Sequence, residues 1–159
     1  MQRTRNLLSE GIRIQSIELL NQYLAASIDL HGQMRQAHWN VRGPGFVELH
    51  RLFDQIAREV DGFANRMAER AGSIGGTAEG TVQAAVKKSF LPQYPLGIAD
   101  SQKHVAAVSD VLSIYCQAAH EASDRAAAFG DINTADLLTE ISRNIDHQLW
   151  QVESNEVPK

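Results

Sequence analysis

Hydrophobic residues recur every three to four positions in four long segments of the chain, and no segment alternates in the manner of a strand. This spacing predicts helices at about residues 9–38, 47–71 and 134–152, and one that runs from a cap at Asp100 or Ser101 to about residue 129. In the second segment a single apolar face extends over about seven turns. It is formed by Leu49, Leu52, Phe53, Ile56, Val60, Phe63 and Met67. We therefore expect an all-α protein.

Glycine and proline residues predict how these helices are connected. Gly43, Pro44 and Gly45 favour a tight reversal between the first two helices, and Gly130 with Asp131 separates the last two. The longer stretch 77–99 contains two prolines and two glycines, and it predicts a crossover that carries a short helix around residues 82–88. Two short connections and one long crossover are typical of a ferritin-like four-helix bundle. We expect one domain over residues 1–159, with short tails at 1–8 and 154–159.

Composition and charge limit the class of protein. The chain has 159 residues, which is typical of one domain, and no apolar run approaches the roughly 20 residues that a membrane span needs. No secretory signal follows Met1, so we expect a cytoplasmic location, with association with the nucleoid left open. The single cysteine, Cys116, is expected to be a small buried residue. A net charge of −4 gives no overall attraction to nucleic acid.

A polar stripe runs along the helix predicted at 47–71. It contains His50, Asp54, Asp61, Asn65 and Glu69, which follow one another at steps of four or seven residues. Because a helix turns by about 100° per residue, these side chains fall within an arc of about 100° that is turned away from the apolar face. Most such stripes are simply solvent-exposed, and that interpretation stays open here.

Two histidines favour a metal site instead. His38 ends the first predicted helix, and His50 lies at the start of the second, one turn before Asp54. Imidazole together with carboxylate is typical of transition-metal ligation. His50 and Glu69 lie about 28 Å apart on a straight helix, so they cannot share a site within one chain. An antiparallel two-fold pair of chains would place the His50 end of one helix beside the Glu69 end of the other, which predicts an intersubunit metal site that occurs twice.

Other common chemistries have no motif in this chain. There is no Gly-rich phosphate loop, no Gly-x-Ser-x-Gly elbow and no Cys-x-x-Cys pair, which excludes the commonest nucleotide-binding, hydrolase and thiol-redox sites. No glutamate precedes a histidine by three residues, so a di-iron site inside the bundle is not expected. A bundle with a purely structural role and no metal remains an alternative.

Several segments resemble one family, the Dps proteins (DNA-binding proteins from starved cells), which are miniferritins of the ferritin-like superfamily. The segments are 36–43 (Gln-Ala-His-Trp-Asn-Val-Arg-Gly), His50 with Asp54, 67–70 (Met-Ala-Glu-Arg), Gly75-Gly76, Gly80-Thr81, Tyr94-Pro95, 134–136 (Thr-Ala-Asp) and 150–155 (Trp-Gln-Val-Glu-Ser-Asn). The most specific part is the His-Trp-Asn segment with a second histidine twelve residues after the first. The resemblance covers nearly the whole chain.

The resemblance to Dps implies a hollow homo-dodecamer that protects against oxidative damage. Such a cage binds Fe(II), oxidises it preferentially with hydrogen peroxide, with dioxygen as the other oxidant, and stores the ferric mineral inside. The matching ferroxidase positions are His38, His50 and Asp54 from one subunit, with Asn65 and Glu69 from its partner. Zinc is left open as another occupant of the same site, because it accepts the same ligand types.

The chain departs from the family pattern at Asn65, where an aspartate is usual. A neutral amide is a weaker ligand and stabilises Fe(III) less than a carboxylate does. We expect Asp61, one turn earlier, to compensate as a metal ligand. The alternative is a cage that sequesters metal or coats DNA with an impaired ferroxidase site.

The resemblance bears on two further features. Family members admit iron through acidic three-fold pores near the start of the last helix, where Asp131, Asp136 and Glu140 fit, although Asp131 also suits a helix N-cap. Members that bind DNA strongly often use a long Lys-rich extension. Here only Arg3 and Arg5 precede the first helix, and residues 153–159 are not basic, so we expect weak or absent DNA binding and no membrane partner.

Overall fold

The structure, a computed structural model, describes residues 1–156. Its elements are α1 (Glu10–Asn40), α2 (Phe46–Ser73), α3 (Val82–Lys88), α4 (Ser101–Phe129) and α5 (Ile132–Glu153). The all-helical prediction is confirmed, and the long helices begin and end within two residues of the predicted positions. Part of the predicted tail, residues 157–159, lies outside the described residues. Within the described range no helix combines the length and the hydropathy needed to cross a bilayer.

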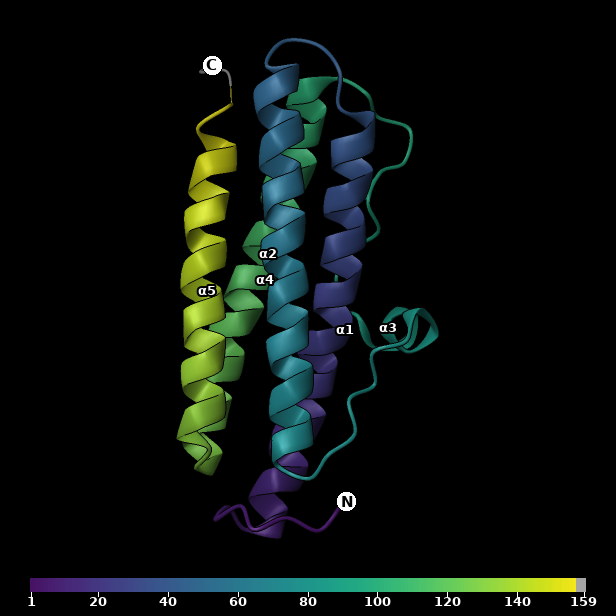
Figure 1. Cartoon of the computed structure of the whole chain (residues 1–159). Helices are drawn as coiled ribbons and strands as arrows, with labels where there is room; N and C mark the ends of the chain where they lie inside the picture. Colours follow the sequence, from purple (N-terminus) through teal and green to yellow (C-terminus); the bar gives the residue numbers. More distant parts are fainter. Residues whose placement is uncertain (157–159) are drawn as a thin grey trace.

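The four long helices form a bundle of two antiparallel pairs (Figure 1). α1 packs against α2, α4 packs against α5, and the two pairs meet through α1 with α4 and α2 with α5. The crossover leaves the end of α2, carries α3 against α1, and returns to the opposite end of the bundle, where α4 begins (Figure 1). As a result α2 and α4 run in the same direction, which is the connectivity of ferritin-like bundles.

Short polar side chains begin most of the helices. Ser9, Thr81, Asp100 and Asp131 each accept a hydrogen bond from a backbone N–H group in the first turn of the helix that follows. These bonds satisfy donors that the helix itself leaves unpaired. α2 begins differently, after Gly45 at φ +74°, a conformation that glycine adopts with little strain. The tight reversal between α1 and α2 depends on this residue.

The core lies between the four long helices and is closed by their apolar faces. Among its largest fully buried side chains are Leu20, Met34, Phe53, Tyr115 and Leu138. Each large side chain removed from water contributes about 1.5–3 kcal/mol to the free energy of folding. Tyr115 also shares a hydrogen bond of 2.7 Å with the Ser27 hydroxyl, so its polar atom is paired. The polar stripe of α2 takes no part in this core.

Buried polar side chains of α1 hold the long crossover in place. Asn21 donates to the carbonyl of Thr77 at 3.0 Å and accepts from the backbone N–H of Glu79 at 2.9 Å. About three turns further along α1, Gln33 donates to the carbonyl of Pro92 at 2.9 Å. The crossover therefore has its backbone groups paired with α1 at two separate levels.

Cys116 is buried between α4 and α5, as expected for a small packed residue. Its thiol donates to the carbonyl of Ser142 at 3.5 Å. Burial, assisted by the nearby carboxylate of Asp146, raises the pKa of the Cys116 thiol to about 11. A thiol with so high a pKa is a poor nucleophile at neutral pH.

Candidate metal centre

The end of α1 and the start of α2 bring His38 and His50 into direct contact. Their ring centroids lie 3.7 Å apart and the planes are inclined by 22°. His38 Nδ1 lies 2.7 Å from the carbonyl oxygen of His50, and His50 Nδ1 lies 2.8 Å from the carbonyl oxygen of His38. Because a carbonyl only accepts, each Nδ1 carries a proton and donates it. In the neutral rings both Nε2 atoms then keep a lone pair that can bind a metal ion.

Asp54 lies one turn after His50 on α2. One of its carboxylate oxygens pairs with Arg35 of α1, and the other pairs with Arg58 of α2. Desolvation opposes ionisation of this carboxyl group. The hydrogen bond from Arg35 and the charges of Arg58 and Arg35 nevertheless hold the pKa of Asp54 below its ordinary value. Asp54 is therefore a charged carboxylate at neutral pH, with both oxygens engaged by arginines.

The other residues of the stripe lie further along α2. Asp61, Asn65 and Glu69 are all exposed, and Asn65 donates from Nδ2 to Glu69 Oε1 at 3.1 Å. The helix rise separates Glu69 from His50 by about 28 Å. Among the described residues, no group of three or more His, Cys, Asp or Glu side chains is close enough to hold a metal ion. One chain thus gathers His38, His50 and Asp54 at one end of α2 without completing a site.

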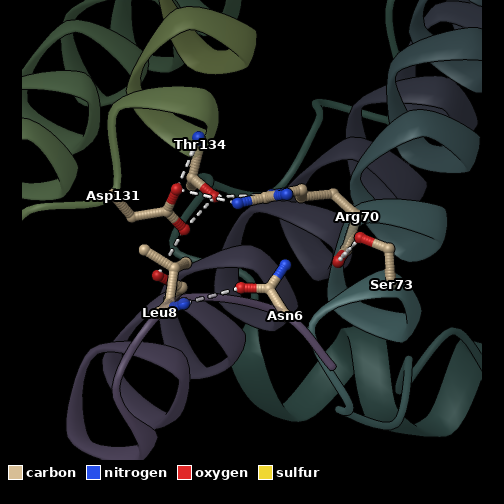
Figure 2. A network of polar contacts seen from close by, with 7 residues as sticks. Asn6, Leu8, Arg70, Ser73, Asp131 and Thr134 are labelled. Atoms are coloured by element: carbon tan, nitrogen blue, oxygen red, sulfur yellow. Dashed lines mark hydrogen bonds and ion pairs between the residues drawn. The ribbon is translucent and has the colours of Figure 1, made fainter. Parts of the chain in front are cut away.

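The carboxylate of Asp131 is bound by residues of its own chain. It is 1% exposed, caps α5, and accepts hydrogen bonds from the hydroxyls of Ser16 and Thr134 at 2.7 and 2.6 Å. Arg70 reaches from α2 to pair with the same carboxylate at 2.8 Å (Figure 2). Burial alone would raise the pKa of Asp131, but these donors hold it below its ordinary value. Because the carboxylate is enclosed, we do not include Asp131 in a proposed pore.

The two other predicted pore residues lie further along α5. Asp136 is exposed, and Glu140 is exposed and paired with Arg66 of α2, at 2.5 Å between Arg66 Nη2 and Glu140 Oε2. The hydrogen bond and charge of Arg66 hold the pKa of Glu140 below its ordinary value. A pore formed by Asp136 and Glu140 stays a prediction.

The sequence did not reveal the arginines that contact the predicted ligand and pore residues. Arg58 follows Asp54 by four residues, and this helical spacing was a usable signal. Arg35 and Arg70 contact carboxylates on other helices, and no local spacing indicates such pairs. Arg35 also lies over the ring of Trp39, with 5.4 Å between the guanidinium carbon and the ring centroid.

Comparisons with known proteins agree on one family. A model of the ferritin-like domain matches residues 17–155. A DNA protection during starvation protein from Agrobacterium fabrum is 35% identical over 153 residues, 96% of this chain and 94% of the relative. Its counterpart from Brevibacillus brevis is 29% identical over 138 residues, 86% of this chain and 91% of the relative.

Solved structures give the same result. DpsC from Streptomyces coelicolor superposes with a TM-score of 0.93 at 28% identity, over 99% of this chain and 92% of the other. Dps from Mycobacterium smegmatis superposes with a TM-score of 0.91 at 27% identity, over 97% and 93%. The chain therefore belongs to the ferritin-like family, in the group of DNA protection during starvation proteins (Dps).

Proposed function

We propose that this chain is the subunit of a miniferritin that binds Fe(II), oxidises it at a site shared by two subunits, and stores the ferric product in a dodecameric cage. The reciprocal hydrogen bonds of His38 and His50 carry most weight, because they leave two Nε2 lone pairs ready for a metal ion. A neighbouring carboxylate, Asp54, is held in its charged form. Membership of the Dps group makes iron the natural substrate.

The second half of the site comes from a second copy of the chain. In an antiparallel pair of α2 helices, Asn65 and Glu69 of the partner subunit would lie beside His38, His50 and Asp54. Exposed aromatic residues support an interface at this end of the bundle. Trp39 and Phe46 flank the histidine pair and are 64% and 43% exposed in the single chain. Burying them against a partner would remove apolar surface from water.

In the proposed reaction two Fe(II) ions each give up one electron, and one hydrogen peroxide molecule accepts both. The O–O bond breaks, and two protons from solvent complete two water molecules. Asp54 of one subunit and Glu69 of the partner subunit would favour the product, because their negative charges stabilise Fe(III) more than Fe(II). Delivering both electrons to one peroxide avoids release of hydroxyl radicals, which gives the protective effect. Dioxygen is the alternative oxidant.

Asn65 supports a second candidate function. Its amide nitrogen is engaged by Glu69, which leaves only a neutral oxygen for a metal ion. A site weakened in this way would give a cage that sequesters metal or coats DNA with little oxidation. Asp61 lies one turn earlier on the same exposed face, and we propose that it supplies the missing carboxylate. Zinc as an alternative occupant stays a prediction.

Fe(II) oxidation by the purified oligomer tests these proposals. The native protein is compared with Glu69→Ala, Asn65→Asp and Asp61→Asn, with peroxide and with air as oxidants. We expect rapid oxidation with peroxide by the native protein, loss in Glu69→Ala and slower turnover in Asp61→Asn. A slow native protein that becomes fast only as Asn65→Asp would favour the sequestering cage instead. Light scattering of the same samples tests the dodecamer.

A further inference from the structure

Both oxygens of Asp54 are already occupied in the single chain. Oδ1 pairs with Nη1 of Arg35, and Oδ2 pairs with Nη2 of Arg58. A metal ion that uses Asp54 as a ligand needs one of these oxygens. Each oxygen has two lone pairs, but a guanidinium and a metal cation on the same oxygen repel and crowd each other. Metal binding at this position is therefore favoured when one arginine leaves.

The two arginines are held very differently. The Arg35 side chain is 28% exposed, extends from α1, and lies over the ring of Trp39. The Arg58 side chain is 73% exposed and reaches Asp54 from the next turn of the same helix. An exposed ion pair of this kind is weak, because water solvates the released guanidinium well. Arg58 is thus the partner that Asp54 loses at the lower cost.

We propose that Arg58 competes with Fe(II) for Oδ2 of Asp54 and is displaced when the metal binds. Arg35 stays in place and orients the carboxylate toward the histidine pair. Both are positioning residues, since they act through Asp54. The inference rests on the proposed function, because it assigns roles around the same site. Its consequence is that the site binds divalent metal less tightly than its ligands alone would allow, so that filling needs a higher Fe(II) concentration.

Co(II) without oxidant provides a probe of binding that does not depend on turnover. Its affinity for the native oligomer and for Arg58→Gln is measured by equilibrium dialysis. We expect Arg58→Gln to bind Co(II) about twofold more tightly, which is the factor for removing a competing exposed ion pair between residues four apart on a helix. Arg51→Gln is the matched control. Arg51 is exposed on the same helix, next to His50, and it forms no ion pair within residues 1–156.

The control distinguishes competition by Arg58 for Asp54 from the general effect of removing a positive charge near the site. Arg51→Gln removes the same charge near the site without releasing Asp54, so its Co(II) affinity is expected to stay close to that of the native protein. If Arg58→Gln binds Co(II) no more tightly than Arg51→Gln does, the proposed competition by Arg58 is wrong. Size-exclusion chromatography of each variant shows that the compared samples are the same oligomer.

The visible absorption of bound Co(II) reports on Arg35, because it depends on coordination geometry. Arg58→Gln is expected to keep the native spectrum. Arg35→Gln frees Oδ1 of Asp54 and is expected to change the spectrum, whereas Arg35→Lys, which can still donate to Oδ1, restores it. An unchanged spectrum in Arg35→Gln would overturn the orienting role of Arg35.

Glu69→Ala distinguishes failure of this inference from failure of the proposed function. Glu69 is exposed, so its removal leaves the bundle intact. If Glu69→Ala weakens Co(II) binding but Arg58→Gln has the same Co(II) affinity as Arg51→Gln, only the proposed competition by Arg58 is wrong. If the native oligomer binds no Co(II), or if Glu69→Ala binds it equally well, the proposed intersubunit site is wrong, and so is the role of Arg58 that depends on it.

Discussion

His38 and His50 each donate a ring N–H to the backbone carbonyl of the other, over 2.7 and 2.8 Å. The two bonds join the last turn of α1 to the second turn of α2 across the reversal that Gly45 permits. They also determine which nitrogen of each ring is free. The same pair of side chains therefore contributes to both the fold and the candidate metal centre.

Replacing His50 should affect both properties. In His50→Ala the carbonyl of His38 loses its donor and the His38 ring loses its stacking partner, so we expect about 1 kcal/mol less stability in thermal unfolding at fixed protein concentration. Oxidation of Fe(II) should be lost as well. The control is His120→Ala, an exposed position on α4, which should change neither quantity. Unimpaired oxidation by His50→Ala would contradict the ligand role.

Asn65→Asp should change stability in opposite directions without and with metal. Without metal the variant loses the hydrogen bond to Glu69 and places two carboxylates four residues apart, which costs about 0.2–0.5 kcal/mol. With Co(II) the additional carboxylate tightens binding, so the metal-induced rise in melting temperature should exceed that of the native protein. Equal rises would show that position 65 does not face the metal.

Asp131→Asn should be strongly destabilising, because it leaves Arg70 without the buried carboxylate that balances its charge. We expect a loss of about 3 kcal/mol. Asp136→Asn, on the exposed side of the same helix, should stay within about 0.5 kcal/mol of native. Chemical denaturation of the three proteins tests this difference.

The same residue has a pH signature. The pKa of Asp131 is lower in the folded chain than the ordinary value of 3.8, so the stability that its charge provides is present above that value. It is lost as pH falls below 3.8 and through the folded pKa. Acid titration followed by circular dichroism should show this component in the native protein, and a shallower acid transition in Asp131→Asn.

His104 predicts a second pH dependence, nearer neutrality. It is fully buried, with Nε2 donating to the carbonyl of Ile98 at 3.1 Å and Nδ1 accepting from the Tyr94 hydroxyl at 2.7 Å. Burial lowers the pKa of His104 below 6.5 in spite of the carbonyls of Ile98 and Asn40 and the charge of Asp100. The unfolded chain therefore takes up a proton first when the pH falls.

It follows that the contribution of neutral His104 is complete above pH 6.5 and decreases as pH falls from 6.5 toward the folded pKa. Melting temperatures measured at several values between pH 5 and 8 should fall less steeply in His104→Gln than in the native protein. His120→Gln, at an exposed position, should keep the native slope. Identical slopes for all three proteins would show that the pKa of His104 does not differ between the folded and unfolded chain.

DNA binding should be weak. The chain has 15 lysines and arginines against 19 acidic residues, and five of the basic side chains are engaged in ion pairs within residues 1–156. The resulting net charge of −4 opposes the approach of phosphates, so we expect no retention of duplex DNA in a gel shift at physiological salt and only weak retention at low salt. Retention or compaction at physiological salt would contradict this prediction.

Local patterns were sufficient to predict the helices. Hydrophobic spacing depends only on the 3.6-residue period, and capping depends on residues within one turn, so both can be read along the chain. The interruption at Gly45 and the cap at Asp100 lie where these rules indicate. The two-residue extensions of α1 and α2 past their predicted ends reflect terminal turns, where periodicity carries little information.

Hydrophobic spacing along the chain was enough to predict an all-helical bundle, and spacing together with family resemblance singled out His38, His50, Asp54 and Glu69 as candidate ligands. What those groups contact became visible in the packed bundle. It showed the reciprocal bonds of the two histidines and the arginines that occupy Asp54. It also placed Asp131 in a buried network instead of on an open surface. Contacts between helices depend on how their faces pack, and periodicity along one helix does not specify its partner across the bundle.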